Sequence, residues 1–491
     1  MRAMVMGRVC ALSVMAIVAG CAGTETTDEE PLGEAEEAAV TSCPWSSPAM
    51  VFEKEQVITD LSVVEDPCRT TWTASGCGSS LAAWTFGKLM SQMAGLRPSS
   101  EFVGEWLHTW EGAQSVNGYI AGARPGTRQH LINPWIAASY ATYTSLGDST
   151  NAARCAPTAV ATPCWTLGCT PTITMSYDSV PITGTGACQL RMDAAPMKLL
   201  AIVNRVDMDG DGGAEGRFVF GLDDAATGAM TQFSGTFILE YKLPTTSTAQ
   251  TWAQDFHALG ALSFGSTYNA QLQAITDRFV KPGVTAGNPN AGSALGQLRT
   301  NEVAFGAQWE MREFHLCQPG IVANDCLLQP FQTANTPDPS KVGSSALSTW
   351  IFANRSAIAA ETATMSKPLE GAASAEGTGL GSGSNFTYWQ DPTGTLTADG
   401  RHLFGLMTCN GCHTAETDTS FTHIQPRQAG KPAKLSPFLA TSADPSASQS
   451  VSDPAGTGTT FLFNEPYRRV CETRRVLAGS ATHYTTRSGA H

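Results

Sequence analysis

The sequence predicts an α+β fold with a mainly antiparallel sheet, followed by a small, mainly helical C-terminal domain. Runs of β-branched and aromatic residues bounded by Gly and Asp predict three neighbouring strands, at 198–206, 217–222 and 236–243. Strands in succession followed by helices favour α+β over alternating parallel units. The later segments with clear patterns are helices at 249–262 and 268–279, strands at 298–304 and 309–316, and a helix at 346–363.

The segments that flank these elements set the predicted domain boundaries. Apolar periodicity predicts helices at 81–93 and 101–110, whereas the Thr-, Pro- and Cys-rich residues 130–195 are expected to be irregular. The Gly/Ser-rich stretch 371–385 has the composition of a flexible linker. We therefore expect an α+β domain at 42–370 and a separate C-terminal domain at 386–491.

The first 21 residues indicate export. Arg2 and Arg8 precede an apolar run at 9–19 that is too short to span a bilayer and typical of a signal peptide. The run ends in Val-Ala-Gly-Cys, with Cys21 last, and resembles a bacterial lipobox, which implies that Cys21 is lipidated. The acidic residues 22–41 then predict a disordered tether, and Ala22 after the cysteine favours the outer membrane.

Composition excludes some classes of partner. The net charge of −13 argues against nucleic acid, whose phosphates require a basic surface. No apolar run of about 18 residues predicts a mature membrane-spanning helix. Attachment to the membrane is therefore expected only through the N-terminal lipid.

Cysteine content predicts disulfides. Besides Cys10 in the signal, Cys21 and the pair 409/412, ten cysteines remain, an even number in an exported chain. Three pairs share the spacing Cys-x8-Cys and are plausible local disulfides: Cys68/Cys77, Cys155/Cys164 and Cys317/Cys326. The sequence leaves the connectivity open, particularly among Cys155, Cys164, Cys169 and Cys188.

The motif with the clearest chemistry is Cys-Asn-Gly-Cys-His at 409–413. Two thiols one helical turn apart can add to the two vinyl groups of haem, with His413 as the proximal iron ligand. The alternative is a local disulfide or a thioredoxin-type thiol pair, but no strand–helix–strand unit precedes it. The motif therefore predicts one covalent haem c held by Cys409, Cys412 and His413.

Residues around this motif resemble a monohaem c-type cytochrome domain. Gly400 and Phe404 match the first helix of that family, although Phe404 stands five residues before Cys409 where the family usually has four. Residues 464–477 would form the terminal helix, with Tyr467 packing on the first. The whole chain also resembles uncharacterised bacterial lipoproteins that carry this motif.

The sixth iron ligand departs from that family, because no Met follows His413. His423, in an apolar setting ten residues later, can reach the other haem face and is the candidate; a surface role for His423 and a five-coordinate iron remain alternatives. His402 is a weaker candidate for the sixth ligand. Arg427 is a candidate partner of the haem propionates.

A second candidate site lies between the first two strands, in Asp-Met-Asp-Gly-Asp-Gly at 207–212. The carboxylates of Asp207, Asp209 and Asp211, with Glu215, suit a hard cation such as Ca²⁺. An EF-hand is excluded because its twelfth position is Phe218, and a simple turn is the alternative. Polar clusters at 204–205, 215–217 and 299–302 are interpreted as buried arginine–carboxylate pairs, with an active site as the alternative.

Three functional hypotheses follow. The first is a lipid-anchored haem c protein of the cell envelope that transfers electrons to an unknown redox partner. The second is a non-enzymatic binding lipoprotein with a Cys409–Cys412 disulfide and a Ca²⁺-stabilised hairpin. The third is an enzyme whose chemistry lies in the α+β domain, with haem as its electron outlet. The sequence favours the first, because no recognised catalytic motif occurs.

Overall fold

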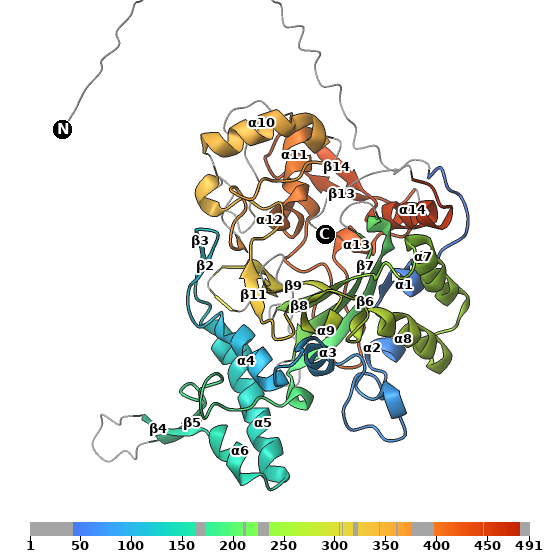
Figure 1. Ribbon diagram of the computed structural model, residues 1–491. Helices are drawn as coiled ribbons and strands as arrows, with labels where there is room; N and C mark the ends of the chain where they lie inside the picture. The colour runs from blue at the N-terminus through green and yellow to red at the C-terminus, as the bar shows by residue number, and fades with distance from the viewer. Residues whose placement is uncertain are drawn as a thin grey trace, which may run out of the picture. The chain divides into compact units, whose positions relative to one another are not determined.

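An antiparallel sheet organises the chain (Figure 1). This computed structural model describes residues 43–162, 172–209, 213–223, 235–303, 305–306, 308–317, 323–342, 344–359, 362–375, 397–444 and 446–481. Its seven strands run in the order β1-β6-β7-β8-β9-β10-β11, and β12 also pairs with β10. The strands are β1 (Val57–Ile58), β6 (Met197–Arg205), β7 (Glu215–Leu222), β8 (Thr236–Lys242), β9 (Leu295–Glu302), β10 (Glu310–Leu316), β11 (Leu328–Phe331) and β12 (Ser374–Ala375).

One face of the sheet is aromatic and carries the larger core. Alternate residues of β7 and β8, including Phe218, Phe220, Phe237 and Leu239, point into it because successive side chains of a strand face opposite sides. Helices cover this face: α3 (Phe86–Met93), α4 (Ser99–His108), α5 (Asn133–Ser145), α7 (Ala249–His257) and α8 (Ser266–Val280).

The opposite face is covered by α10 (Ser345–Ala359) and by the C-terminal part of the chain. There, Val203 and Val219 of the sheet belong to the same core cluster as Phe404 and Phe438. The C-terminal elements are α11 (Ala398–Met407), α12 (Cys409–Cys412), α13 (Pro437–Ala440), β13 (Gln449–Ser452), β14 (Thr460–Phe463) and α14 (Glu465–Leu477). Because these residues share a core with the sheet, a separate cytochrome-like domain is not seen.

The predicted elements are largely present, with ends shifted by a few residues. The α+β class and the antiparallel sheet are confirmed. The expectation that residues 130–195 are irregular is wrong, because α5, α6 (Ser149–Arg154) and the hairpin of β4 (Thr158–Thr162) and β5 (Thr172–Ser176) lie there. The end of the 371–385 linker lies outside the described residues, while Ser374 and Ala375 form β12.

The smaller elements complete the described chain. They are α1 (Phe52–Glu55), α2 (Leu61–Val64), α9 (Pro289–Gly292) and the hairpin of β2 (Gln114–Val116) and β3 (Tyr119–Ala121). Single turns are η1 (Gly78–Ser80), η2 (Arg128–Ile132), η3 (Met192–Ala194), η4 (Val206–Met208), η5 (Ala258–Ala261), η6 (Pro339–Lys341) and η7 (Ala415–Thr417). No described helix is long and apolar enough to cross a membrane.

Four disulfides join described cysteines: Cys43–Cys471, Cys68–Cys77, Cys155–Cys188 and Cys317–Cys326. Two of the three predicted local pairs are therefore confirmed. The Cys155–Cys164 pair is wrong, because Cys155 at the end of α6 is bonded to Cys188. Cys164 and Cys169 lie outside the described residues. Disulfides of this number are typical of proteins that fold outside the cytoplasm.

Candidate functional site

The Cys-x-x-Cys-His motif occupies a sharp turn between α11 and η7. Thr408 ends α11 in an extended conformation and begins α12, where its Oγ1 accepts a hydrogen bond from Gly411 N at 3.1 Å. The same hydroxyl donates to Gly405 O at 2.7 Å. One threonine side chain thus ends the first helix and caps the second, as N-cap hydroxyls do.

Gly411 is required for this turn by close packing. A Cβ on Gly411 would stand 2.1 Å from Gly405 O, and a Cβ on Gly405 would stand 2.8 Å from the side chain of Glu416. The backbone at Gly405 cannot withdraw from residue 411 without separating α11 from α12. The glycine inside the motif therefore brings the two cysteines and His413 against the end of α11.

Both motif cysteines are buried thiols, unlike the eight other described cysteines, which form disulfides. Cys409 packs on Trp309 and Met311 of the sheet, and its amide donates to Thr336 Oγ1 at 2.9 Å. Burial raises the pKa of the Cys409 thiol above its ordinary value. Cys409 is therefore protonated near neutral pH, which does not suit a thiolate nucleophile.

His413 is held by the chain that follows it. Its Nδ1 lies 2.8 Å from Phe421 O, and Phe421 N donates to His413 O at 2.9 Å. Because a carbonyl only accepts, Nδ1 carries the proton and the lone pair is on Nε2, the usual tautomer of a metal-ligating histidine. Burial lowers the pKa of His413 to about 4, so the ring is neutral at pH 7.

The sheet supports this arrangement through β9. Asn301 Nδ2 donates to the same Phe421 carbonyl at 2.5 Å, and Asn301 Oδ1 accepts from Trp309 Nε1 at 2.5 Å. The Trp309 indole also stacks on the His413 ring at a centroid distance of 6.0 Å. The orientation of His413 is thus fixed by residues more than 100 positions earlier in the chain.

His423 lies next to His413, a proximity that the spacing in the sequence permits but does not require. The two ring centroids are 4.4 Å apart, and His423 Nε2 is 3.5 Å from Cys412 Sγ. His423 Nδ1 is 2.9 Å from Ser436 Oγ, and the ring contacts Phe438. The structure therefore brings together Cys412, His413 and His423.

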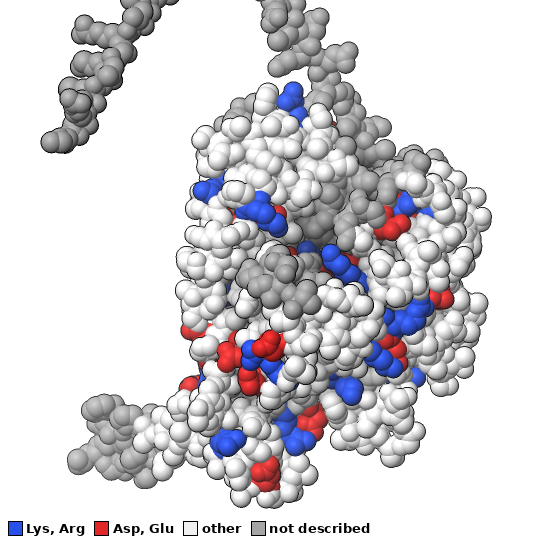
Figure 2. All heavy atoms as spheres, in the orientation of Figure 1, with Lys and Arg blue, Asp and Glu red and all other residues white. Residues whose placement is uncertain are grey.

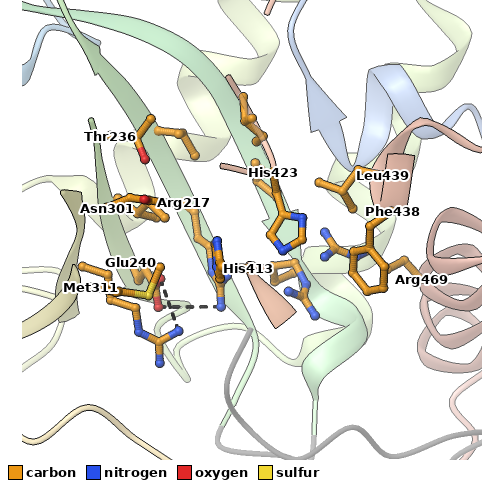
Figure 3. A pocket seen from close by; sticks show the side chains of 16 residues that line it. Arg217, Thr236, Glu240, Asn301, Met311, His413, His423, Phe438, Leu439 and Arg469 are labelled. Atoms are coloured by element: carbon orange, nitrogen blue, oxygen red, sulfur yellow. Dashed lines mark ion pairs between the residues drawn. The ribbon is translucent and has the colours of Figure 1, made fainter. Parts of the chain in front are cut away.

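These histidines line a cavity over the face of the sheet that α10 and the C-terminal residues cover (Figure 3). This is the polar face of the sheet, because Arg205, Arg217, Glu240 and Arg299 lie on it. The cavity has a volume of about 80 Å³, well below the roughly 300–1,000 Å³ of typical small-molecule sites, so a larger ligand would require the lining side chains to move. Its walls are aliphatic and aromatic on one part and charged on another. The lining residues are Val203, Arg205, Arg217, Val219, Thr236, Ile238, Glu240, Arg299, Asn301, Met311, His413, His423, Ile424, Phe438, Leu439 and Arg469.

Most of the charged lining comes from the sheet, and Arg469 of α14 adds to it. Arg217 pairs with Glu215 at 2.7 Å and faces Glu240 at 3.6 Å, while Arg299 faces Glu240 at 3.8 Å and Glu313 at 3.4 Å. The polar clusters predicted at 204–205, 215–217 and 299–302 thus contain buried arginine–carboxylate pairs. Their convergence on one cavity was not predicted, because it depends on strand pairing.

Arg427 does not line this cavity. Its guanidinium binds the carboxylate of Glu65 and lies within 3.3 Å of Val64 O and 3.4 Å of Leu199 O. Arg427 lines a different hollow, next to α3. Arg427 therefore joins the C-terminal segment to α2 (Leu61–Val64) and β6, and its side chain does not face the histidines.

The other candidate ligands are also apart from the histidines. Asp207 is buried, with Arg205 Nε 3.0 Å and Arg468 3.6 Å from its carboxylate, and Glu215 is paired with Arg217. Nearby arginines hold the pKa of Asp207 below its ordinary value despite burial. Asp211 lies outside the described residues, so a Ca²⁺ site stays a prediction. His402 is hydrogen-bonded to Glu416 and stacked on Phe461.

Among the described residues, no three His, Cys, Asp or Glu side chains are grouped so as to hold a metal ion. A bare metal ion usually needs three or four protein ligands, whereas haem iron takes four from its macrocycle and one or two from the protein. The donor set at 409–413 fits the second case. Cys21 and the residues before it lie outside the described residues.

Comparisons of this chain with protein-family models, with curated proteins and with solved structures give no significant match. The functional argument therefore depends on the motif and on the cavity beside it.

Proposed function

We propose that this chain is an exported haem c protein that transfers electrons, with haem bonded to Cys409 and Cys412 and ligated by His413. The carrying observation is that neither Cys409 nor Cys412 forms a disulfide, whereas the eight other described cysteines do, and that Cys412 Sγ lies 3.5 Å from Nε2 of His423, which lines the cavity together with His413. In an oxidising compartment, thiols with a dedicated partner are the ones expected to escape disulfide formation.

Several contacts suit the chain to this role. The hydrogen bond from His413 Nδ1 to Phe421 O directs Nε2 to a metal, and a buried, neutral imidazole needs no deprotonation to bind it. Trp309, Ile424 and Phe438 supply the apolar contacts that a macrocycle requires. When bound, haem supplies a one-electron couple, and the protein supplies burial and axial ligands.

The sixth ligand is proposed to be His423, with one geometric condition. A metal–imidazole bond is about 2 Å, so two rings on opposite sides of one iron have centroids roughly 6 Å apart. The present separation is 4.4 Å. His423 would therefore have to give up its contact with Ser436 and swing away from His413. If His423 keeps its present position, the iron would be five-coordinate.

The cellular setting completes the proposal. A lipid on Cys21 and an acidic tether would hold the folded body at the outer membrane, with an unidentified protein as redox partner. The four disulfides support a place outside the cytoplasm.

The direct test is covalent haem. We expect the chain, produced in a host with working cytochrome c maturation, to keep haem after denaturation in SDS, detected by haem staining and by the added mass. Cys412→Ala should lose most of it. The matched control is the double variant Cys68→Ala/Cys77→Ala, which removes a local disulfide of the body and should keep the haem.

Recovery of the full apoprotein mass from such a host would overturn the proposal. The chain would then be better explained as a binding lipoprotein without haem.

A further inference from the structure

Arginine dominates the charged lining of the cavity. Its lining residues include four arginines and a single acid, Glu240, which is already engaged by Arg217, Arg299 and Gln297. The remaining two arginines, Arg205 and Arg469, come from the end of β6 and from α14, and both side chains are at least nine-tenths buried.

The pairing of Arg205 and Arg469 is incomplete. Among the described residues, Arg469 has one hydrogen-bonding side-chain partner, Glu465, whose Oε1 is 2.8 Å from Nε. Arg205 likewise has only Asp207, at 3.0 Å from Nε and 3.1 Å from Nη2. Each of these carboxylates is also shared with Arg468. Each acid is thus divided between two guanidinium groups.

The two cations also repel one another. Burial, with the adjacent charge of Arg469, lowers the pKa of Arg205 to about 10. Holding buried cations close together is costly unless an anion compensates them. A cavity lies directly beside both, and the planar guanidinium fork matches a carboxylate in bidentate geometry.

The surroundings indicate the rest of the ligand. Phe438, Leu439 and Ile424 line the same cavity, and Figure 3 shows Phe438 and Leu439 close to Arg469. We propose that Arg205 and Arg469 form a binding site for the carboxylate of a ligand whose apolar body lies against Phe438 and Leu439. The carboxylate can come from the haem of the proposed function, as a propionate, or from a free small molecule.

Benzoate is the probe, because it joins a carboxylate to an apolar ring, and benzamide is its uncharged control. Thermal unfolding of the full chain is followed against benzoate concentration, with haem attached and in haem-free protein from a host without cytochrome c maturation. A ligand that binds the folded state raises the melting temperature in a saturable way. We expect this for haem-free protein with benzoate and not with benzamide.

The variants assign the effect to the arginines. Arg469→Gln should weaken the apparent benzoate affinity about tenfold or more, because a charge-assisted pair is lost. Arg475→Gln is the matched control: it removes an equally buried arginine of α14, which pairs with Glu472 and does not line the cavity. Arg469→Lys keeps the positive charge but loses the planar guanidinium fork, so this variant should bind benzoate more weakly than the wild-type protein. It tests the same inference if Arg469→Gln fails to fold.

The two sources of the carboxylate are distinguished by the haem-loaded protein. If benzoate stabilises only the haem-free form, a propionate occupies the site. If it stabilises both forms equally, the site takes a free carboxylate, and the same holds if no haem attaches at all. No saturable effect of benzoate on the haem-free wild-type protein, or an effect that Arg469→Gln leaves unchanged, overturns the inference.

Discussion

Replacing Glu416 by alanine tests the ion cluster that supports the Cys-x-x-Cys-His turn. Glu416 is fully buried and accepts from Arg401 Nη1 at 2.5 Å and Nη2 at 3.1 Å, and its Oε2 lies 2.7 Å from His402 Nδ1. The carboxylate therefore joins α11 to η7 across the motif. Removing one partner of a buried ion pair costs about 3–5 kcal/mol, since the other charge is left without compensation.

The lower end of that range is expected, because Arg401 retains Asp453, whose Oδ1 is 2.6 Å from Nη2. We expect Glu416→Ala to lower the free energy of unfolding by about 3 kcal/mol, measured by urea unfolding followed through tryptophan fluorescence. The control is Glu101→Ala, because the carboxylate of Glu101 pairs with Arg97 on the surface of α4. This substitution should change the free energy of unfolding by less than about 1 kcal/mol. A loss below about 1 kcal/mol for Glu416→Ala would refute the assigned supporting role.

Three further predictions concern the ligands and the anchor. His423→Ala should make the reduced haem spectrum high-spin and allow carbon monoxide to bind; an unchanged low-spin spectrum would assign the sixth position to another residue. Cys21→Ala should move the folded protein from the membrane fraction to the soluble fraction, and continued membrane retention would contradict lipidation. The predicted Ca²⁺ site at 207–215 implies that Asp209→Ala lowers the melting temperature in Ca²⁺ but not in chelator, because a ligand that binds only the folded state stabilises it, and equal changes in both buffers would reject the site.

Elements with a strong local signal could be predicted from the sequence. The strands β6, β7 and β8 combine β-branched and aromatic residues with turn residues at their ends, and the structure has them within about two residues of the predicted bounds. Helix α5 was missed, although its buried residues Trp135, Ile136, Ser139 and Tyr143 follow helical spacing. The abundance of Thr and Pro around it obscured that pattern.

Features that depend on distant parts of the chain could not be predicted. Cys155 has three possible partners in the sequence, Cys164, Cys169 and Cys188, and only the three-dimensional structure selects Cys188. Likewise, Arg469 gives no local signal of a site, because its role depends on the packing of α14 beside η4. The motif indicates His413, and its spacing and apolar setting indicate His423, but the carbonyl of Phe421 that orients His413 is visible only in three dimensions.

The polar face of the sheet gives a physical reason to look for function here. An antiparallel sheet commonly leaves one face to water, and its polar residues are then cheaply solvated. In this chain the residues from 397 onward cover that face, so Arg205, Glu240 and Arg299 become buried. Buried ion pairs contribute little net stability compared with apolar residues of the same size. A fold selected for stability alone would place aliphatic side chains at these positions, as it does at Val203 and Val219 nearby. Arg205, Glu240 and Arg299 border the cavity lined by His413 and His423. Charged side chains at such a cavity can serve function as well as stability.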